Sequence, residues 1–221
     1  MHSRPKVYLP PIDTQARLAD LGLNEKDLVQ SVQRGQAARA SCTANHPPIY
    51  HGYRAWAETV CALRDFLRPK GWTRSDAGNL PLTINKSGKI CLAVSTCDEA
   101  TGKEDRVPCT RPRGPRTKIV VTTNAYQYNL FKDTGVRLCP EDLKEINGNM
   151  TWILLFHHDV KMNEVRAELS RPIKMNADGE VDGWAERIIL KSTPISGDEV
   201  RVPTDVPQTP DVVVDVKRKR V

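Results

Sequence analysis

Two separated stretches of alternating apolar and polar residues constrain the fold of this chain most strongly. The first lies within residues 80–94, with a turn at 86–89, and the second within residues 152–190, with turns at 161–163, 178–179 and 182–183. Successive side chains of a strand point to opposite faces, so a period of two is typical of strands with one buried face. The pattern predicts a β-hairpin in the first stretch and further strands in the second, about five antiparallel strands in all.

The residues before these stretches have the period of helices. Asn24 is a favourable N-cap and is followed by acidic residues in the first turn, which predicts a helix over 25–40. Within residues 53–67 apolar side chains recur every three or four positions, which predicts a second helix with one buried face. A shorter helix over 14–21 gives two or three N-terminal helices in total.

The residues between the two β stretches have no such period. From Asp98 to Asn124 the sequence is rich in charge, proline, glycine and threonine. A long structureless stretch is unusual inside a compact domain, so we expect a flexible insertion. We therefore predict one α+β domain from residues 1–97 and 150–191, with an antiparallel sheet of about five strands packed on the helices, a flexible insertion over 98–149 and a disordered tail over 192–221.

Positive charge is concentrated in the expected insertion. The chain has 33 lysines and arginines against 27 acidic residues, a net charge of +6. Five cations and no anion lie between positions 106 and 118: Arg106, Arg111, Arg113, Arg116 and Lys118. Basic linkers contact phosphates without reading sequence, so we expect these side chains to bind nucleic acid non-specifically. Trp72, beside Arg74, either stacks a base or, in the interpretation that we favour, anchors the core.

No feature of the sequence predicts secretion, membrane insertion or a metal site. No apolar run approaches the ~18 residues that a membrane helix needs, and the first residues contain no apolar signal core. The six cysteines lack the close pairs typical of zinc sites, so we expect reduced thiols. We therefore expect a soluble cytoplasmic protein with no metal, no cofactor and no membrane partner.

A pentapeptide at positions 127–131 is the most specific functional pattern. Its sequence, Gln-Tyr-Asn-Leu-Phe, resembles the Gln-Leu-Ser/Asp-Leu-Phe motif by which many bacterial proteins bind the replication sliding clamp. The resemblance implies that Gln127, Leu130 and Phe131 bind the clamp, the first through its amide and the other two as apolar anchors. In the alternative interpretation, the same segment is a strand or helix that packs on the core through its apolar and aromatic side chains.

A wider resemblance concerns three blocks of the chain. Residues 34–42, 71–74 and 178–190 are similar to uncharacterised proteins of proteobacterial mobile elements. No activity follows from this resemblance. It implies a role in plasmid or integrative-element maintenance, in defence or in counter-defence, and with that role a protein partner.

Candidate catalytic residues are few. His157 and His158 end a predicted strand, and adjacent strand residues point to opposite faces, so both cannot ligate one metal without a bend. An alternative metal site would combine His158, Asp159 and Glu164 across the following turn. A metal-dependent nuclease would need a Glu-x-Lys pair, but the residue two positions after Glu164 is Arg166, which cannot deprotonate. We assign no catalytic residue.

The leading hypothesis is a non-enzymatic, DNA-associated adaptor that is recruited to the sliding clamp. The first alternative is a mobile-element accessory protein that binds and modulates a host or defence complex. The second alternative is a metal-dependent nuclease.

Overall fold

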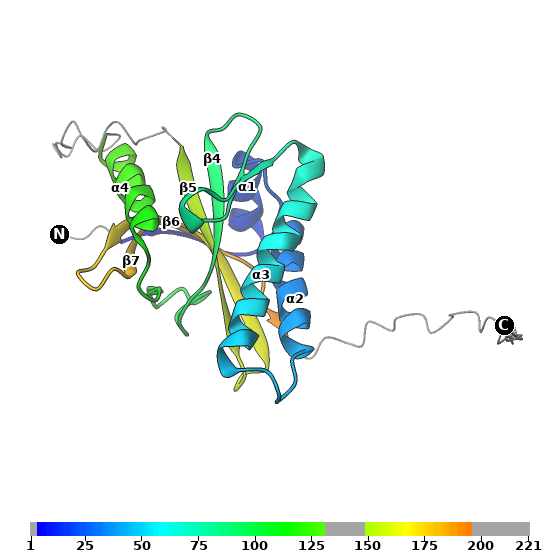
Figure 1. The fold of residues 1–221 in the computed structure, drawn as a ribbon. Coiled ribbons are helices and arrows are strands. Elements are labelled where there is room, and N and C mark those ends of the chain that lie inside the picture. The colour runs from blue at the N-terminus through cyan, green and yellow to red at the C-terminus, as the bar shows by residue number, and fades with distance from the viewer. Residues whose placement is uncertain (1–3, 131–148, 196–221) are drawn as a thin grey trace, which may run out of the picture.

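The computed structural model describes residues 4–130 and 149–195, which form a sheet with helices on both faces (Figure 1). The described α-helices are α1 (Ile12–Asp20), α2 (Glu25–Ala40), α3 (Pro48–Leu67) and α4 (Pro115–Leu130), with short 3-10 helices η1 (Arg68–Lys70) and η2 (Ala77–Asn79). The strands are β1 (Lys6–Tyr8), β2 (Thr73–Ser75), β3 (Leu82–Ile84), β4 (Ile90–Thr96), β5 (Met150–Asp159), β6 (Glu164–Met175), β7 (Val181–Ile189) and β8 (Thr193–Pro194). A search of the described helices finds none with the length and apolar character needed to cross a bilayer.

All the described strands belong to one mixed sheet. Its order is β1-β7-β6-β5-β4-β3-β2, and β8 pairs with β6. β4 and β5 are parallel, as are β1 and β7, whereas the other pairs are antiparallel. The α+β class is confirmed. The prediction of about five antiparallel strands is wrong in number, and it is wrong in direction for the β4–β5 and β1–β7 pairs. An alternating pattern identifies buried faces and contains no information about the direction of a neighbouring strand.

The first face of the sheet is apolar and lies beneath α1, α2 and α3. α2 begins as predicted, because the Asn24 side chain accepts a hydrogen bond from the Asp27 amide at 2.8 Å. Trp152, Leu154 and Phe156 of β5 point to this face and form one buried cluster with apolar side chains of the three helices. α2 and α3 lie side by side across it (Figure 1). We call this the helix face.

The second face is covered by α4 and by the loop before it. Val121 of α4 packs in a smaller apolar cluster with Ile153 of β5. Asn124, also in α4, is fully buried and donates to the carbonyls of Thr151, at 2.7 Å, and Pro172, at 3.0 Å. These two bonds join the middle of α4 to β5 and β6.

Residues 97–114, the covering loop, lie over charged groups of the second face. Glu168 and Arg187 are buried there with their side-chain oxygen and nitrogen 2.5 Å apart. The backbone carbonyls of Lys103 and Arg106 accept hydrogen bonds from the Arg187 guanidinium at 2.9 and 2.8 Å. We call this side of the sheet the loop face.

The loop face differs from the expectation of an insertion without structure from residue 98 to residue 124. The covering loop is packed on the sheet, and α4 begins at Pro115. The buried positions of α4 include Thr117, Val121 and Asn124, so its inward face has no apolar stripe that a hydrophobic pattern could reveal. The remainder of the predicted insertion, 131–148, and of the predicted tail, 196–221, lies outside the described residues.

Candidate functional site

The five cations predicted to bind nucleic acid do not form one group. The Arg113 guanidinium points inward and donates to the Ser95 hydroxyl and, at 3.1 Å, to the Thr96 carbonyl; burial lowers its pKa. Arg106 forms a surface ion pair with Glu99 at 3.1 Å. The other three side chains are exposed: Arg111, Arg116 and Lys118. Two of the five thus hold the covering loop, and three lie at the surface, where a ligand could reach them.

Arg116 and Lys118 lie in the first turn of α4, and Arg111 precedes the helix in the covering loop; we call the three exposed residues the α4 cations. The N-terminal end of a helix carries a partial positive charge, which adds to that of the side chains. The first turn of α4 contains no acidic residue. The Arg116 side chain extends toward η2, where its Cδ would lie 3.1 Å from a Cβ at Gly78. Arg116 therefore approaches the edge of the sheet that contains β2, whereas Lys118 lines a pocket with Ile173 and Met175 of β6.

The predicted clamp motif lies at the end of α4. Gln127 is half-buried, and Leu130 is the last residue of the helix. Phe131 and the side chain of Leu130 lie outside the described part of the chain. The ring of Tyr128 is 5.8 Å from the Arg171 guanidinium carbon, which links the last turn of α4 to β6. The first residue of the motif is therefore helical and not part of an extended segment.

The two histidines at the end of β5 point to opposite faces of the sheet. His157 Nδ1 lies 3.1 Å from the Cys97 carbonyl on the loop face, whereas the His158 ring contacts the edge of Phe156 on the helix face at 5.4 Å between centroids. Burial, with smaller contributions from Arg39 and His157, lowers the pKa of His158 to about 4. His158 is thus neutral at pH 7. Within residues 4–130 and 149–195 no cluster of three or more metal-ligating side chains is present.

The carboxylates suggested for a metal-dependent nuclease are bound to an arginine. Arg166 Nη1 lies 2.7 Å from Asp159 and 2.9 Å from Glu164. The same guanidinium donates to the carbonyls of Thr101 and Glu99 at 2.9 and 2.8 Å. The hydrogen bond from Arg166 lowers the pKa of Asp159. These groups therefore join the β5–β6 turn to the covering loop.

Two thiols lie at the base of the covering loop. Cys97 Sγ donates to the Cys109 carbonyl at 3.2 Å, and neither residue forms a disulfide. Burial raises the pKa of Cys97 to about 12 and that of Cys109 to about 11. The thiolate is the reactive form of cysteine, so both are poor nucleophiles at neutral pH.

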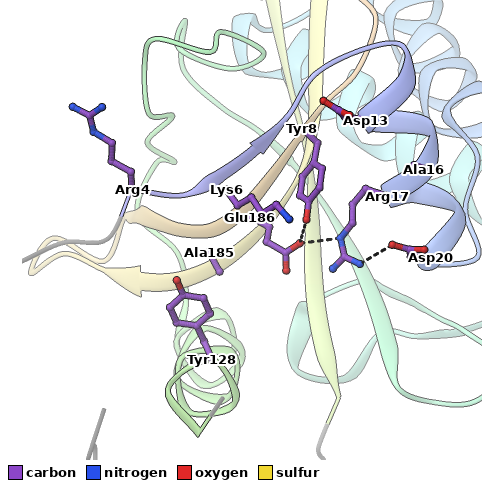
Figure 2. Close-up of a pocket in the computed structure, with 10 residues that line it drawn as sticks. All are labelled: Arg4, Lys6, Tyr8, Asp13, Ala16, Arg17, Asp20, Tyr128, Ala185 and Glu186. Carbon is purple, nitrogen blue, oxygen red and sulfur yellow. Dashed lines mark hydrogen bonds and ion pairs between the residues drawn. The ribbon is translucent and has the colours of Figure 1, made fainter. Parts of the chain in front are cut away.

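A groove of about 680 Å³ lies between β1, α1, β7 and the end of α4 (Figure 2). Tyr8 and Arg17 point toward Glu186, whose Oε2 accepts from the Tyr8 hydroxyl at 3.3 Å and from Arg17 Nε at 2.9 Å. Arg171 lies 3.6 Å from the other oxygen of Glu186. Two arginines thus compensate one carboxylate at this position.

The charges that line this groove balance one another. Arg4, Lys6 and Arg17 are matched by Asp13, Asp20 and Glu186. Arg17 also contacts Asp20 at 3.4 Å, so one guanidinium joins α1 to β7. We interpret these contacts as structural. Because Tyr128 forms part of the groove wall, the clamp motif borders it (Figure 2).

A comparison with known protein families, curated protein sequences and solved structures found no match.

The charged groups of the loop face were not predicted from the sequence. Along β6 three polar residues alternate with apolar ones, a pattern that by itself is typical of a strand with one face in solvent. Glu168 and Ser170 are nevertheless fully buried, and Arg166 is 6% exposed. The available signal was a pair of opposite charges, Glu168 and Arg187, in two predicted strands. The two charges indicate a buried ion pair only when the pairing of β6 with β7, which brings them together, is known.

Proposed function

We propose that this chain is a non-enzymatic adaptor that associates with DNA through phosphate contacts. The observation that carries the proposal is the exposure of Arg116 and Lys118 in the first turn of α4 and of Arg111 in the loop that precedes it. No carboxylate interrupts the sequence between positions 106 and 118. Lysine and arginine at a helix N-terminus attract phosphate without reading bases, so binding that depends on salt and not on sequence is expected.

The remaining polar groups favour binding over catalysis. Asp159 and Glu164 are both bound to Arg166, and Glu186 lies between two arginines. A general base or a metal ligand needs an accessible lone pair, and these carboxylates already accept hydrogen bonds. They support an interpretation in which the charged interior maintains the fold.

The test compares two variants that each remove two positive charges. Arg111→Gln/Arg116→Gln changes the α4 cations, and Lys161→Gln/Lys191→Gln changes two exposed lysines that form no ion pair within the described residues. The measurement is the affinity for a labelled DNA duplex by fluorescence anisotropy over a range of salt concentrations. We expect the first variant to bind the duplex about tenfold more weakly than the control variant. We also expect the slope of log affinity against log salt concentration to be smaller by about 1 to 2. Equal affinities for the two variants would contradict the proposed role of the α4 cations.

The protein partner in this proposal is a sliding clamp, bound by Gln127, Leu130 and Phe131. The support is positional: the motif lies across the end of α4, with Gln127 and Leu130 in its last turn. If the clamp groove takes an extended peptide, that turn must unwind. Helix ends open at lower free energy than helix centres, so such a step is physically accessible.

Recovery of the clamp in a pull-down tests this second contact. We expect Leu130→Ala/Phe131→Ala to lose the clamp. A matched control is Val160→Ala/Met162→Ala, which truncates two apolar side chains that are 75% and 68% exposed in the β5–β6 turn. Recovery of the clamp by the first variant at the level of the control would contradict clamp binding and leave the DNA proposal intact.

A further inference from the structure

A second groove, of about 600 Å³, lies at the edge of the sheet formed by β2. Its lining comes from the last turns of α3, from η1 and from β2 and β3, and we call it the β2 groove. Trp72 contributes to the lining but is only 7% exposed and belongs to the core cluster of the helix face. The interpretation of Trp72 as a core anchor is confirmed. A ring buried to this extent offers no surface on which a base can stack.

The β2 groove has a net positive charge, because three arginines (Arg64, Arg68 and Arg74) and one carboxylate (Asp65) line it. Between positions 64 and 89 the chain contains two carboxylates and six cations: Arg64, Arg68, Lys70, Arg74, Lys86 and Lys89. Both carboxylates are already bound to arginines, Asp65 to Arg34 at 2.8 Å and Asp76 to Arg64 at 2.6 Å. Lys70 is also bound, to Asp27. Arg68, Arg74, Lys86 and Lys89 form no ion pair within the described residues, so a net positive charge remains along this edge.

Arg68 and Arg74 are the two arginines of the groove that are positioned to take a ligand. Both are exposed, and neither forms an ion pair with any residue of the described chain. Arg64, by contrast, is held by Asp76 and by the Leu82 carbonyl at 3.5 Å. It fixes one wall of the groove. The exposed arginines thus project from a rigid base, which reduces the entropy lost on binding.

The cationic edge extends beyond the groove in two directions. The Lys86 side chain lies against Gly71, 3.5 Å from the position of a Cβ there. On the other side, Arg116 extends over Gly78 in η2, directly after β2. Of the α4 cations, Arg116 therefore lies at the turn of the β2–β3 hairpin whose strands line the groove.

We propose that the β2 groove binds the sugar-phosphate backbone of nucleic acid, with Arg68 and Arg74 each contacting a phosphate. Guanidinium groups bind phosphate through paired N–H donors. Cations contributed by α3, η1, β2 and the β3–β4 turn match an extended polyanion better than a single phosphate group. The inference rests on the proposed association with DNA and gives it a second contact surface, which sequence analysis did not assign. Because Trp72 cannot stack, recognition at this groove is independent of base sequence.

The experiment uses the full chain with Arg68→Gln/Arg74→Gln. Lys161→Gln/Lys191→Gln is again the control with matched charge. The pairing of β2 through β3 and β4 aligns Thr73 with Thr151 at the start of β5. Lys161 follows the other end of that strand, roughly 26 Å away at 3.3 Å per residue. Affinity for a labelled duplex is measured against salt concentration, with circular dichroism to verify folding.

We expect the groove variant to bind the duplex about tenfold more weakly than the control variant. We also expect the slope of log affinity against log salt concentration to be smaller by about 1 to 2. The inference is overturned if the groove and control variants bind equally well. Loss of affinity in Arg111→Gln/Arg116→Gln alone would then leave the proposed function standing. Absence of duplex binding by the wild-type chain at low salt would overturn both.

A second arm separates nucleic acid from other polyanions. The same variants are mixed with vesicles that contain anionic phosphatidylserine and, separately, with inorganic phosphate as a competitor of the duplex. We expect no vesicle binding that depends on Arg68 and Arg74, and no competition by millimolar phosphate. Vesicle binding that the groove variant loses, or displacement of the duplex by phosphate alone, would contradict a site for the nucleic-acid backbone.

Discussion

The sheet is covered by three helices on one face and by α4 and an irregular loop on the other, and the residues beneath the helices differ from those beneath the loop. On the helix face, Trp152, Leu154 and Phe156 pack against apolar side chains of α1, α2 and α3. On the loop face, Glu168 and Arg187 form a buried ion pair beneath the covering loop. Both faces are buried, but apolar packing stabilises the helix face, whereas ion pairs and hydrogen bonds stabilise the part of the loop face beneath the covering loop.

The difference has a physical cause in the backbone of the two covers. A helix satisfies its own amides and carbonyls, so it can lie on an apolar surface. A buried loop has backbone groups that need other partners. On the loop face Arg187 donates to the carbonyls of Lys103 and Arg106, and Glu168 accepts from the Gly102 amide at 2.8 Å. The polar residues of the sheet thus complete the hydrogen bonding of the loop.

The largest effect predicted is loss of the buried ion pair through Glu168→Gln. The substitution preserves shape but leaves the Arg187 charge without a compensating carboxylate, so we expect a loss of about 3–5 kcal/mol in the free energy of unfolding. Urea denaturation measures the loss. Asp65→Asn is the matched control, because it removes an acid from a pair with Arg34 whose members are about half exposed; we expect less than about 1 kcal/mol there. Similar losses for the two variants would contradict the view that the loop face depends on this pair.

Truncation of neighbouring leucines in β5 compares the packing of the two faces directly. Leu154 points to the helix face and Leu155 to the loop face, and both are fully buried. We expect Leu154→Ala to cost about 3–5 kcal/mol and Leu155→Ala about 2–3 kcal/mol, because an irregular cover relaxes more readily around a cavity than three packed helices do. Chemical denaturation of the two variants under one condition tests the order. A greater loss for Leu155→Ala would show that the loop face is the more rigid of the two.

The helix face could largely be predicted from the sequence. The predicted helix over 25–40 coincides with α2, and Asn24 caps it. The predicted helix over 53–67 lies within α3, which begins five residues earlier, at Pro48. Apolar residues at regular spacing identify such helices, because a helix needs one apolar face whichever element it packs against. The strands β1, β2 and β8 have three residues or fewer, too few to show a period.

The loop face could not be predicted in the same way. α4 presents Thr117 and Asn124 to the sheet beside Val121, so no apolar period marks it. The candidate site shows the same limit. The cationic run was visible, but the inward position of Arg113 depends on a contact with Ser95 in β4, and the β2 groove forms only when α3 and β2 meet. The position of Arg113 and the formation of the groove therefore both depend on contacts between residues that are distant in the sequence.

Acidic pH should weaken the helix face at His158, whose ring is buried beside Phe156. The pKa of His158 is lowered to about 4, chiefly by burial, from an ordinary value of 6.5. Between these two values the unfolded chain binds a proton that the folded chain does not, so stability falls as pH decreases through this window. The loss is at most about 3 kcal/mol. We expect His158→Leu to reduce the decrease in unfolding free energy between pH 6.5 and pH 4, measured relative to pH 8. An unchanged decrease would contradict burial of a neutral imidazole.

The smallest predicted effects come from single hydroxyl groups, one on each face. Thr14 donates to the Ile189 carbonyl at 2.8 Å under α1, whereas Ser170 donates to the Glu168 carboxylate at 2.6 Å. A hydrogen bond to a charged acceptor contributes more than one to a neutral carbonyl, so Ser170→Ala should cost about 2 kcal/mol and Thr14→Val about 1 kcal/mol. Thermal and urea denaturation of the two variants give the comparison. If Thr14→Val costs as much as Ser170→Ala, the charge of Glu168 adds nothing to its hydrogen bonds. The loop face would then be stabilised by shape alone.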